Sequence, residues 1–170
     1  MRSAQLFPIP GPWLGHLAVI PRPRGGDWLE EEAGAWRRSG IDVVVSLLES
    51  EEAAQLDLLT ERQAAETNGI QFISFPIPDR GLPASTPAAL SLLSDITGAL
   101  EQGKSVAVHC RQSIGRAGLI AAGVLIASGI TPDRALEAVT SARGLTVPET
   151  SEQREWICQL PSRASIANTR

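Results

Sequence analysis

Short apolar blocks alternate with amphipathic segments along the chain, and this alternation predicts strands and helices in turn. Four short apolar blocks predict strands, over residues 17–20, 41–48, 70–75 and 105–108, and the β-branched run at the centre of 41–48 is typical of a strand covered on both faces of a sheet. Apolar residues at helical spacing predict helices over residues 27–38, 50–68, 86–102 and 117–128, and further helices that open at residues 131 and 150. We therefore expect an α/β fold with a central, mainly parallel sheet of about four to five strands flanked by helices.

Capping signals and a proline-rich loop separate these elements. Asp27 and Glu30 stand at capping-box spacing for the first helix, and Pro87 occupies the first turn of the helix that opens at Thr86. The segment 76–83 contains three prolines, which exclude a helix because each lacks a backbone donor. Ligands of parallel sheets bind beyond the carboxyl ends of the strands, so the loop after residue 108 is where we expect a site.

The composition limits what the chain can be. With 170 residues, 43% hydrophobic and 20% charged, it has the size of one domain, which we expect to span residues 1–160, followed by a flexible polar tail over residues 161–170. A net charge of −4 argues against a nucleic-acid partner, and no apolar run has the length of a membrane span. No apolar leader follows Met1, so a cytoplasmic location is expected. The oligomeric state stays open.

Few residues are available for redox or metal chemistry. We expect Cys110 and Cys158 to be reduced thiols, with Cys158 in the core beside Trp156. His16 and His109 form no ligand-spaced cluster, so neither a metal nor another cofactor is expected. The four tryptophans are expected to be core or partly buried packing residues.

The loop after the strand 105–108 combines a thiol, a glycine and an arginine. It reads His109-Cys110-Arg111-Gln112-Ser113-Ile114-Gly115-Arg116. A helix that starts after a strand and a short loop directs free backbone N–H groups at an anion, and its dipole favours the thiolate of Cys110, a strong nucleophile. Arg116 can donate two parallel N–H bonds to phosphoryl oxygens. The alternative is a buried cysteine at the end of a strand, with Arg116 in a salt bridge.

This loop, Cys-(any five residues)-Arg preceded by histidine, resembles the active-site loop of the cysteine-based protein phosphatases, above all the dual-specificity group. The resemblance implies a phosphatase-like fold and hydrolysis of phosphomonoesters, carried by proteins or small molecules, through a phosphocysteine on Cys110. It implies that Arg116 binds substrate and transition state and that His109 supports the loop and the thiolate. The substrate-binding residues that it implies are Arg111, Gln112, Ser113, Ile114, Gly115 and Ala117.

Two residues outside the loop complete the set that the resemblance implies. Asp79, in Pro-Ile-Pro-Asp, is similar to the family's acid, which protonates the leaving group and later acts as general base, a role typically worth about 10²–10⁴ in rate. Stabilising a turn is its alternative role. Gln153 is similar in position to a family glutamine that orients the hydrolytic water, although an exposed helix glutamine fits the pattern equally.

The sequence departs from the family at two positions. Ser113 stands where the family prefers glycine. Ala117 stands where the family has a serine or threonine, whose hydroxyl stabilises the departing thiolate. Because Ala117 lacks this hydroxyl, we expect the phosphoenzyme to accumulate. Arg111, at the rim, is either solvated or favours polyanionic substrates. The alternatives are therefore a slow or inactive phosphate-binding module and a phosphatase of inositol phosphates or phosphoinositides. A rhodanese-like fold is disfavoured by Asp79 in its own proline loop and by the helices predicted after Arg116.

Overall fold

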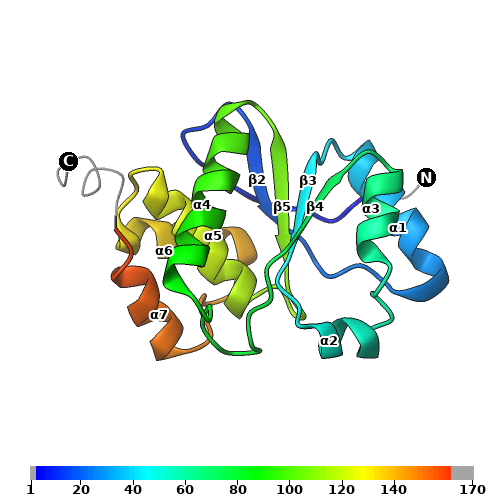
Figure 1. Cartoon of the computed structure of the whole chain (residues 1–170). Coiled ribbons are helices and arrows are strands. Elements are labelled where there is room, and N and C mark those ends of the chain that lie inside the picture. The colour runs from blue at the N-terminus through cyan, green and yellow to red at the C-terminus, as the bar shows by residue number, and fades with distance from the viewer. Residues whose placement is uncertain (1–2, 162–170) are drawn as a thin grey trace.

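The computed structural model describes residues 3–161, which form a five-stranded sheet between two layers of helices (Figure 1). The strand order is β1 (Phe7–Ile9), β2 (His16–Val19), β5 (Ser105–His109), β3 (Val43–Ser46) and β4 (Gln71–Ser74). Strands β2, β5, β3 and β4 run parallel, and β1 pairs antiparallel with β2 at one edge. The predicted α/β fold with a mainly parallel sheet is confirmed.

Helices cover both faces of this sheet. On one side lie α1 (Leu29–Arg38) and α3 (Glu61–Thr67), and on the other α4 (Thr86–Glu101), α5 (Gly115–Ala127), α6 (Pro132–Arg143) and α7 (Ser151–Cys158) (Figure 1). The short helix α2 (Ser50–Gln55) lies beyond the carboxyl end of β3 (Figure 1). A 3₁₀ turn (Gly26–Trp28) precedes α1.

Strand alternation divides the apolar core between the two faces. In β5, Val106 and Val108 join the cluster under α4–α7, and Cys110 continues this series, whereas Ala107 faces the cluster under α1 and α3. His109 follows Ala107 on that second face. Helix α5 packs against α4, α6, α7 and the sheet, and all its residues from 115 to 126 are buried. The loop before α5 is therefore anchored between the central strand and the central helix.

The N-terminal half contains one strand and one break that were not predicted. Strand β1 lacks a β-branched run and includes Pro8, which an edge strand tolerates because no neighbour requires its N–H. The single helix expected over residues 50–68 is wrong: α2 and α3 are separated by a turn at Asp57, whose φ is +56°, with Leu58 buried beneath it. The capping box at Asp27 is also absent, because the 3₁₀ turn occupies its place and α1 begins at Leu29 without a side-chain cap.

Two packing predictions need correction. Cys158 is exposed and not in the core, because Gln153 and Ile157 form the buried side of α7. Trp28 is 53% exposed, with the guanidinium of Arg24 stacked over its ring, whereas the other three tryptophans are buried or partly buried as expected. Of the predicted tail, residues 162–170 lie outside the described residues.

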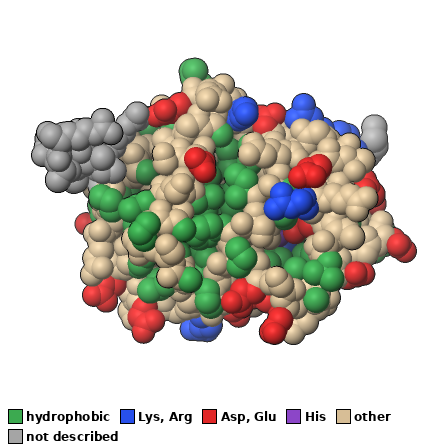
Figure 2. All heavy atoms as spheres, in the orientation of Figure 1, with side chains coloured by type: hydrophobic (Ala, Val, Ile, Leu, Met, Phe, Trp, Pro, Cys, Tyr) green, Lys and Arg blue, Asp and Glu red, His purple; other side chains and the backbone are tan. Residues whose placement is uncertain are grey.

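Charges are mixed on the molecular surface. On the face shown in Figure 2, acidic and basic side chains are interspersed among polar and apolar ones and form no continuous basic area. No helix among residues 3–161 has the length and apolar character needed to cross a membrane.

Candidate active site

The loop between β5 and α5 lies at the carboxyl end of the central strand. Strand β5 ends at His109 and α5 begins at Gly115, so residues 110–114 form the turn between them. Cys110 is a free thiol that is only 3% exposed. The first N–H groups of α5 have no acceptor within the helix and are available to an anion in front of the thiol. This is the strand–loop–helix arrangement expected from the sequence.

Arg116, in the first turn of α5, is held by one edge of its guanidinium. It is 2% exposed, and its Nη1 donates to both carboxylate oxygens of Glu52, at 3.0 and 2.8 Å, and to the carbonyl of Ile77 at 2.9 Å. On the opposite edge, formed by Nε and Nη2, Nη2 donates to Oδ1 of Asp79 at 3.3 Å. Such an edge can donate two parallel bonds to phosphoryl oxygens. The salt bridge with Glu52 and a ligand-binding role are therefore compatible.

The charges around Arg116 keep it ionised. Burial by itself lowers its pKa, but the hydrogen bond with Glu52 and the negative charges of Cys110, Glu52 and Asp79 outweigh burial, so the pKa of Arg116 lies above its usual value. A buried cation without such partners would be strongly destabilising. The same acids that stabilise the guanidinium therefore also hold it in place beside the thiol.

The loop after β4 brings Asp79 to Arg116. The N–H of Ile77 is bonded to the residue that follows β3, and the N–H of Gly81 donates to the carbonyl of Pro78 at 2.8 Å, so the turn is fixed on both sides of Asp79. The Asp79 side chain is 62% exposed, and its Oδ1 accepts from Arg116 Nη2 at 3.3 Å. The carboxylate thus reaches the Nε–Nη2 edge of Arg116 while most of its surface remains exposed.

Ser113 occupies a position where glycine has a conformational advantage. Its φ of +57° lies in the left-handed region, which costs a non-glycine residue about 1–2 kcal/mol. Two hydrogen bonds hold it there: Ser113 Oγ donates to the carbonyl of Ile20, and Arg143 Nε donates to the Ser113 carbonyl at 2.9 Å. Arg143 also lies over the ring of Phe7. Burial lowers the pKa of Arg143, and the negative charge of Cys110 offsets part of that effect.

His109 is on the other face of the sheet from Cys110. Its Nε2 is hydrogen-bonded to Oε1 of Glu61, the first residue of α3, and its Nδ1 lies 3.4 Å from the Cys110 carbonyl oxygen. The ring of Trp36 stacks on the imidazole with a centroid separation of 6.5 Å. The His109 imidazole therefore contacts the backbone of the loop, at the Cys110 carbonyl, and does not face a bound phosphoryl group.

Gln153 is buried, so the alternative of an exposed surface glutamine is wrong. Its backbone and side chain form a capping box with Thr150, and its Nε2 donates to the carbonyl of Gly81 at 3.1 Å. A Cβ atom added to Gly115 would lie 3.2 Å from Gln153 Oε1. Gln153 thus lies between α7, the loop that carries Asp79 and the start of α5.

The remaining loop residues differ in exposure. Arg111 is partly exposed and donates from Nη1 to Gln55 Oε1 at 3.3 Å, and Gln112 is exposed. Ile114 is partly buried against the core, and Ala117 is fully buried within it. The rim of the loop is therefore formed by Arg111 and Gln112, and its base by apolar side chains.

Three charged residues at the loop were not found from the sequence: Glu52, Glu61 and Arg143. Glu52 and Glu61 stand in the first turns of short helices, where an acid is common because it interacts favourably with the helix dipole. Arg143 ends α6, where a basic residue is equally common. Their local patterns are those of ordinary helix ends, and only the tertiary fold brings them to the loop.

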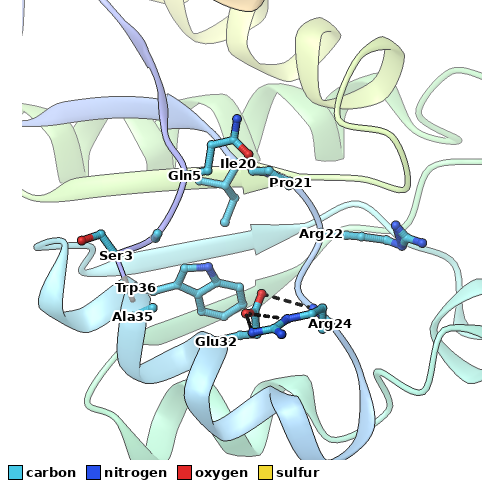
Figure 3. A pocket seen from close by; sticks show the side chains of 10 residues that line it. Ser3, Gln5, Ile20, Pro21, Arg22, Arg24, Glu32, Ala35 and Trp36 are labelled. Carbon is cyan, nitrogen blue, oxygen red and sulfur yellow. Dashed lines mark hydrogen bonds and ion pairs between the residues drawn. The ribbon is translucent and has the colours of Figure 1, made fainter. Parts of the chain in front are cut away.

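A separate cavity of about 120 Å³ lies on the α1 side of the sheet (Figure 3). Ile20 and Trp36 line it together with the ion pair between Arg24 and Glu32, in which Nη2 and Oε1 are 2.8 Å apart. No residue of the 110–116 loop lines it, so it is distinct from the candidate active site. Within the part of the chain that the structure describes, no three His, Cys, Asp or Glu residues are grouped to hold a metal ion.

Together, the fold and the loop define the class of cysteine-loop phosphatases. A family model described as "Tc-R-P: Polymorphic toxin system, DSP-PTPase phosphatase" matches residues 20–130, a range that includes Asp79, Cys110 and Arg116. The chain belongs to this dual-specificity phosphatase family.

Individual relatives agree with this assignment. The chain is 34% identical over 113 residues to protein tyrosine phosphatase domain-containing protein 1 of Mus musculus; the match covers 61% of the chain but only 15% of that longer relative. Among solved structures, Tk-PTP in its active form has 31% identity and a TM-score of 0.73, with 86% and 91% of the two chains covered. Kinase associated phosphatase, at 17% identity, shares the fold with a TM-score of 0.85 over 98% of each chain.

Proposed function

We propose that this chain hydrolyses phosphomonoesters of the phosphotyrosine or dual-specificity type through a phosphocysteine on Cys110, and that residues 1–160 act as one catalytic domain. The observation that carries the proposal is the geometry of Arg116, in the first turn of α5, whose Nη1 is bound by Glu52 and Ile77 while its Nη2 donates to Asp79. A phosphoryl group bound by the Nε–Nη2 edge of Arg116 and by the N–H groups at the start of α5 lies in front of the Cys110 thiolate.

In the first step, the thiolate sulfur of Cys110 attacks phosphorus. An S–P bond forms while the bond from phosphorus to the leaving oxygen breaks, and Arg116 stabilises the charge on the equatorial oxygens. Asp79, in its protonated form, gives its proton to the leaving oxygen. The position of its exposed carboxylate, 3.3 Å from Arg116 Nη2, supports this role, whereas the charge of Arg116 by itself favours the ionised form.

In the second step, a water molecule oriented by Gln153 attacks the phosphocysteine. The Asp79 carboxylate accepts a proton from the water, the S–P bond breaks, and inorganic phosphate leaves. Ala117 offers no hydroxyl to the departing thiolate, so this step is the slower one. The lack of a hydroxyl at Ala117 also favours a second candidate, a phosphate-binding module with little turnover, and burst kinetics separate the two.

The test compares the wild type with Cys110→Ser and Asp79→Asn on two substrates. The Cys110→Ser variant should lose turnover completely. Because the second step limits kcat, the acid role of Asp79 is measured in the first step: Asp79→Asn should lower the burst rate by about 10²–10⁴ on a phosphotyrosine peptide, whose leaving phenol has a pKa of about 10, and by less on p-nitrophenyl phosphate, whose leaving group needs less protonation.

Rapid-quench kinetics on the wild type should give a burst of phenol release equal to the enzyme concentration, followed by slower turnover. A burst with almost no later turnover would assign the chain to the phosphate-binding module. Phosphatase activity that survives Cys110→Ser would refute the covalent mechanism.

A further inference from the structure

A buried acid–imidazole pair lies behind the active-site loop, on the face of the sheet opposite to the thiol. Glu61 is 2% exposed and His109 is fully buried, and the two are hydrogen-bonded to each other. Glu61, the first residue of α3, is 48 residues from His109 along the chain. Burying a carboxylate is costly unless it is paired, and the hydrogen bond with His109 provides this pairing.

The donor and acceptor inventory of the pair fixes where its protons lie. The Cys110 carbonyl oxygen can only accept, so His109 Nδ1, 3.4 Å away, must carry a hydrogen for the contact to be favourable. Nε2 then faces Glu61 Oε1, and a single proton lies between these two atoms. Without the carboxylate, the imidazole would be free to adopt the other tautomer, whose Nδ1 lone pair would oppose the carbonyl.

The packing around the imidazole restricts its orientation. Trp36 stacks on the ring at an interplanar angle of 28°. The stacked indole limits tilting of the ring plane, and Glu61 fixes rotation within the plane. These two contacts leave one ring orientation, in which Nδ1 is directed at the Cys110 carbonyl.

We propose that Glu61 is a positioning residue of the active site: through His109 it holds the Cys110 carbonyl, and thereby sets the backbone path of residues 110–116 that binds the phosphoryl group. The inference rests on the proposed phosphatase function. Glu61 touches neither substrate nor thiol. Its effect reaches the site through one side chain and one peptide group.

Substitutions of Glu61 distinguish the effect of its side-chain length from that of its charge. Glutamine keeps the length and can donate from its amide to Nε2, so Glu61→Gln should retain the ring orientation and most of the activity. Aspartate keeps the charge but is one methylene shorter, so Glu61→Asp should lose the contact. Methionine has similar volume and no hydrogen bond. Carboxylates that orient histidines in metal sites typically contribute 10- to 100-fold to activity, and we expect a loss of about that size for Glu61→Asp and Glu61→Met.

The control is Ile70→Ala, in the same apolar cluster but at the opposite end of the strands. It should lower the melting temperature without changing kcat or KM of the folded protein. The exposed Cys158 is replaced by serine throughout, so that alkylation by iodoacetamide reports Cys110 alone. For each variant, kcat, KM for p-nitrophenyl phosphate, the alkylation rate of Cys110 and its protection by inorganic phosphate are measured.

The proposal requires Glu61→Asp to lower kcat and change the Cys110 alkylation rate while Glu61→Gln stays close to the wild type. Wild-type values in Glu61→Asp, or equal losses in Ile70→Ala, overturn it, even where Glu61→Met does not fold. A wild type that neither hydrolyses substrate nor is protected by phosphate instead overturns the proposed phosphatase function. In that case the alkylation rates of the Glu61 variants still decide the positioning role.

Discussion

The pair between Glu52 and Arg116 links the stability of the fold directly to its chemistry, and Glu52→Gln tests that link. Glu52 accepts both of its hydrogen bonds from Arg116 Nη1, and its side chain is only 11% exposed. The substitution removes one full negative charge and one acceptor oxygen while leaving the side-chain volume unchanged. Arg116 would then still form its ion pair with Asp79, but Asp79 is largely exposed and only partly compensates the buried positive charge.

The structure sets the size of the expected effect. Glutamine still provides one carbonyl acceptor, so the loss corresponds to one hydrogen bond to a charged group, about 1.5–3 kcal/mol. Removing the partner entirely, as in Glu52→Ala, should cost roughly 3–5 kcal/mol. For a chain of this length, a loss of 2 kcal/mol lowers Tm by roughly 4–8 °C. Because only backbone carbonyls and one amide oxygen would then hold Nη1, the guanidinium would be less well fixed, and kcat/KM should fall by about 10- to 100-fold.

Thermal and urea unfolding, together with steady-state kinetics, measure both consequences. Glu51→Gln is the matched control, because Glu51 is the exposed neighbour on the same helix, and its unfolding free energy should change by no more than about 0.5 kcal/mol. Wild-type stability and wild-type kcat/KM in Glu52→Gln would refute the argument that this carboxylate fixes the guanidinium.

Three further substitutions have expected outcomes. A Cβ on Gly118 would lie 2.0 Å from Val147 Cγ1, so Gly118→Ala should destabilise the fold by about 1–3 kcal/mol in urea titration; an unchanged midpoint would contradict the close approach. Ala117→Ser should speed the second chemical step, so rapid-quench experiments should show a smaller burst relative to turnover, and an unaltered burst would exclude this role for the hydroxyl. Cys158→Ser should change stability by no more than about 0.5 kcal/mol and leave turnover unchanged, because the thiol is exposed; a loss of turnover would assign Cys158 a part in the reaction.

Elements with a strong local pattern were predictable from the sequence. The buried strand β3 contains a run of three valines, β5 is a short buried apolar block, and the helices opened by Thr131 and Thr150 begin where their caps indicate. The break at Asp57 was not predictable in the same way, because alanine and acidic residues on both sides favour a helix, whereas the burial of Leu58 and the bond from the Gly26 N–H to the Asp57 carbonyl at the turn are tertiary contacts.

The residues of the candidate site likewise divide into those with a distinctive local sequence pattern and those that only the tertiary fold brings to the loop. Cys110, Arg116 and Asp79 stand in segments with a distinctive local arrangement, and the structure brings Asp79 to Arg116. Glu61 and Arg143 are separated from the loop in sequence, and their local patterns give no reason to place them beside it. The exposure of Cys158 was missed for a related reason, since a helix of eight residues buries only a narrow side, and its apolar neighbours did not reveal which side that was.

The depth at which α5 is buried also determines how the site responds to ionic strength. A helix dipole at a surface is screened by salt, but α5 is enclosed by protein from residue 115 to 126, and mobile ions cannot approach its sides. The attraction that it exerts on a phosphate should therefore persist at high salt. Arg111 at the rim is within reach of the electrolyte, so any contribution that it makes to holding a polyanion should fade as salt is added. The dependence of KM on salt thus separates the attraction of the helix from that of the rim.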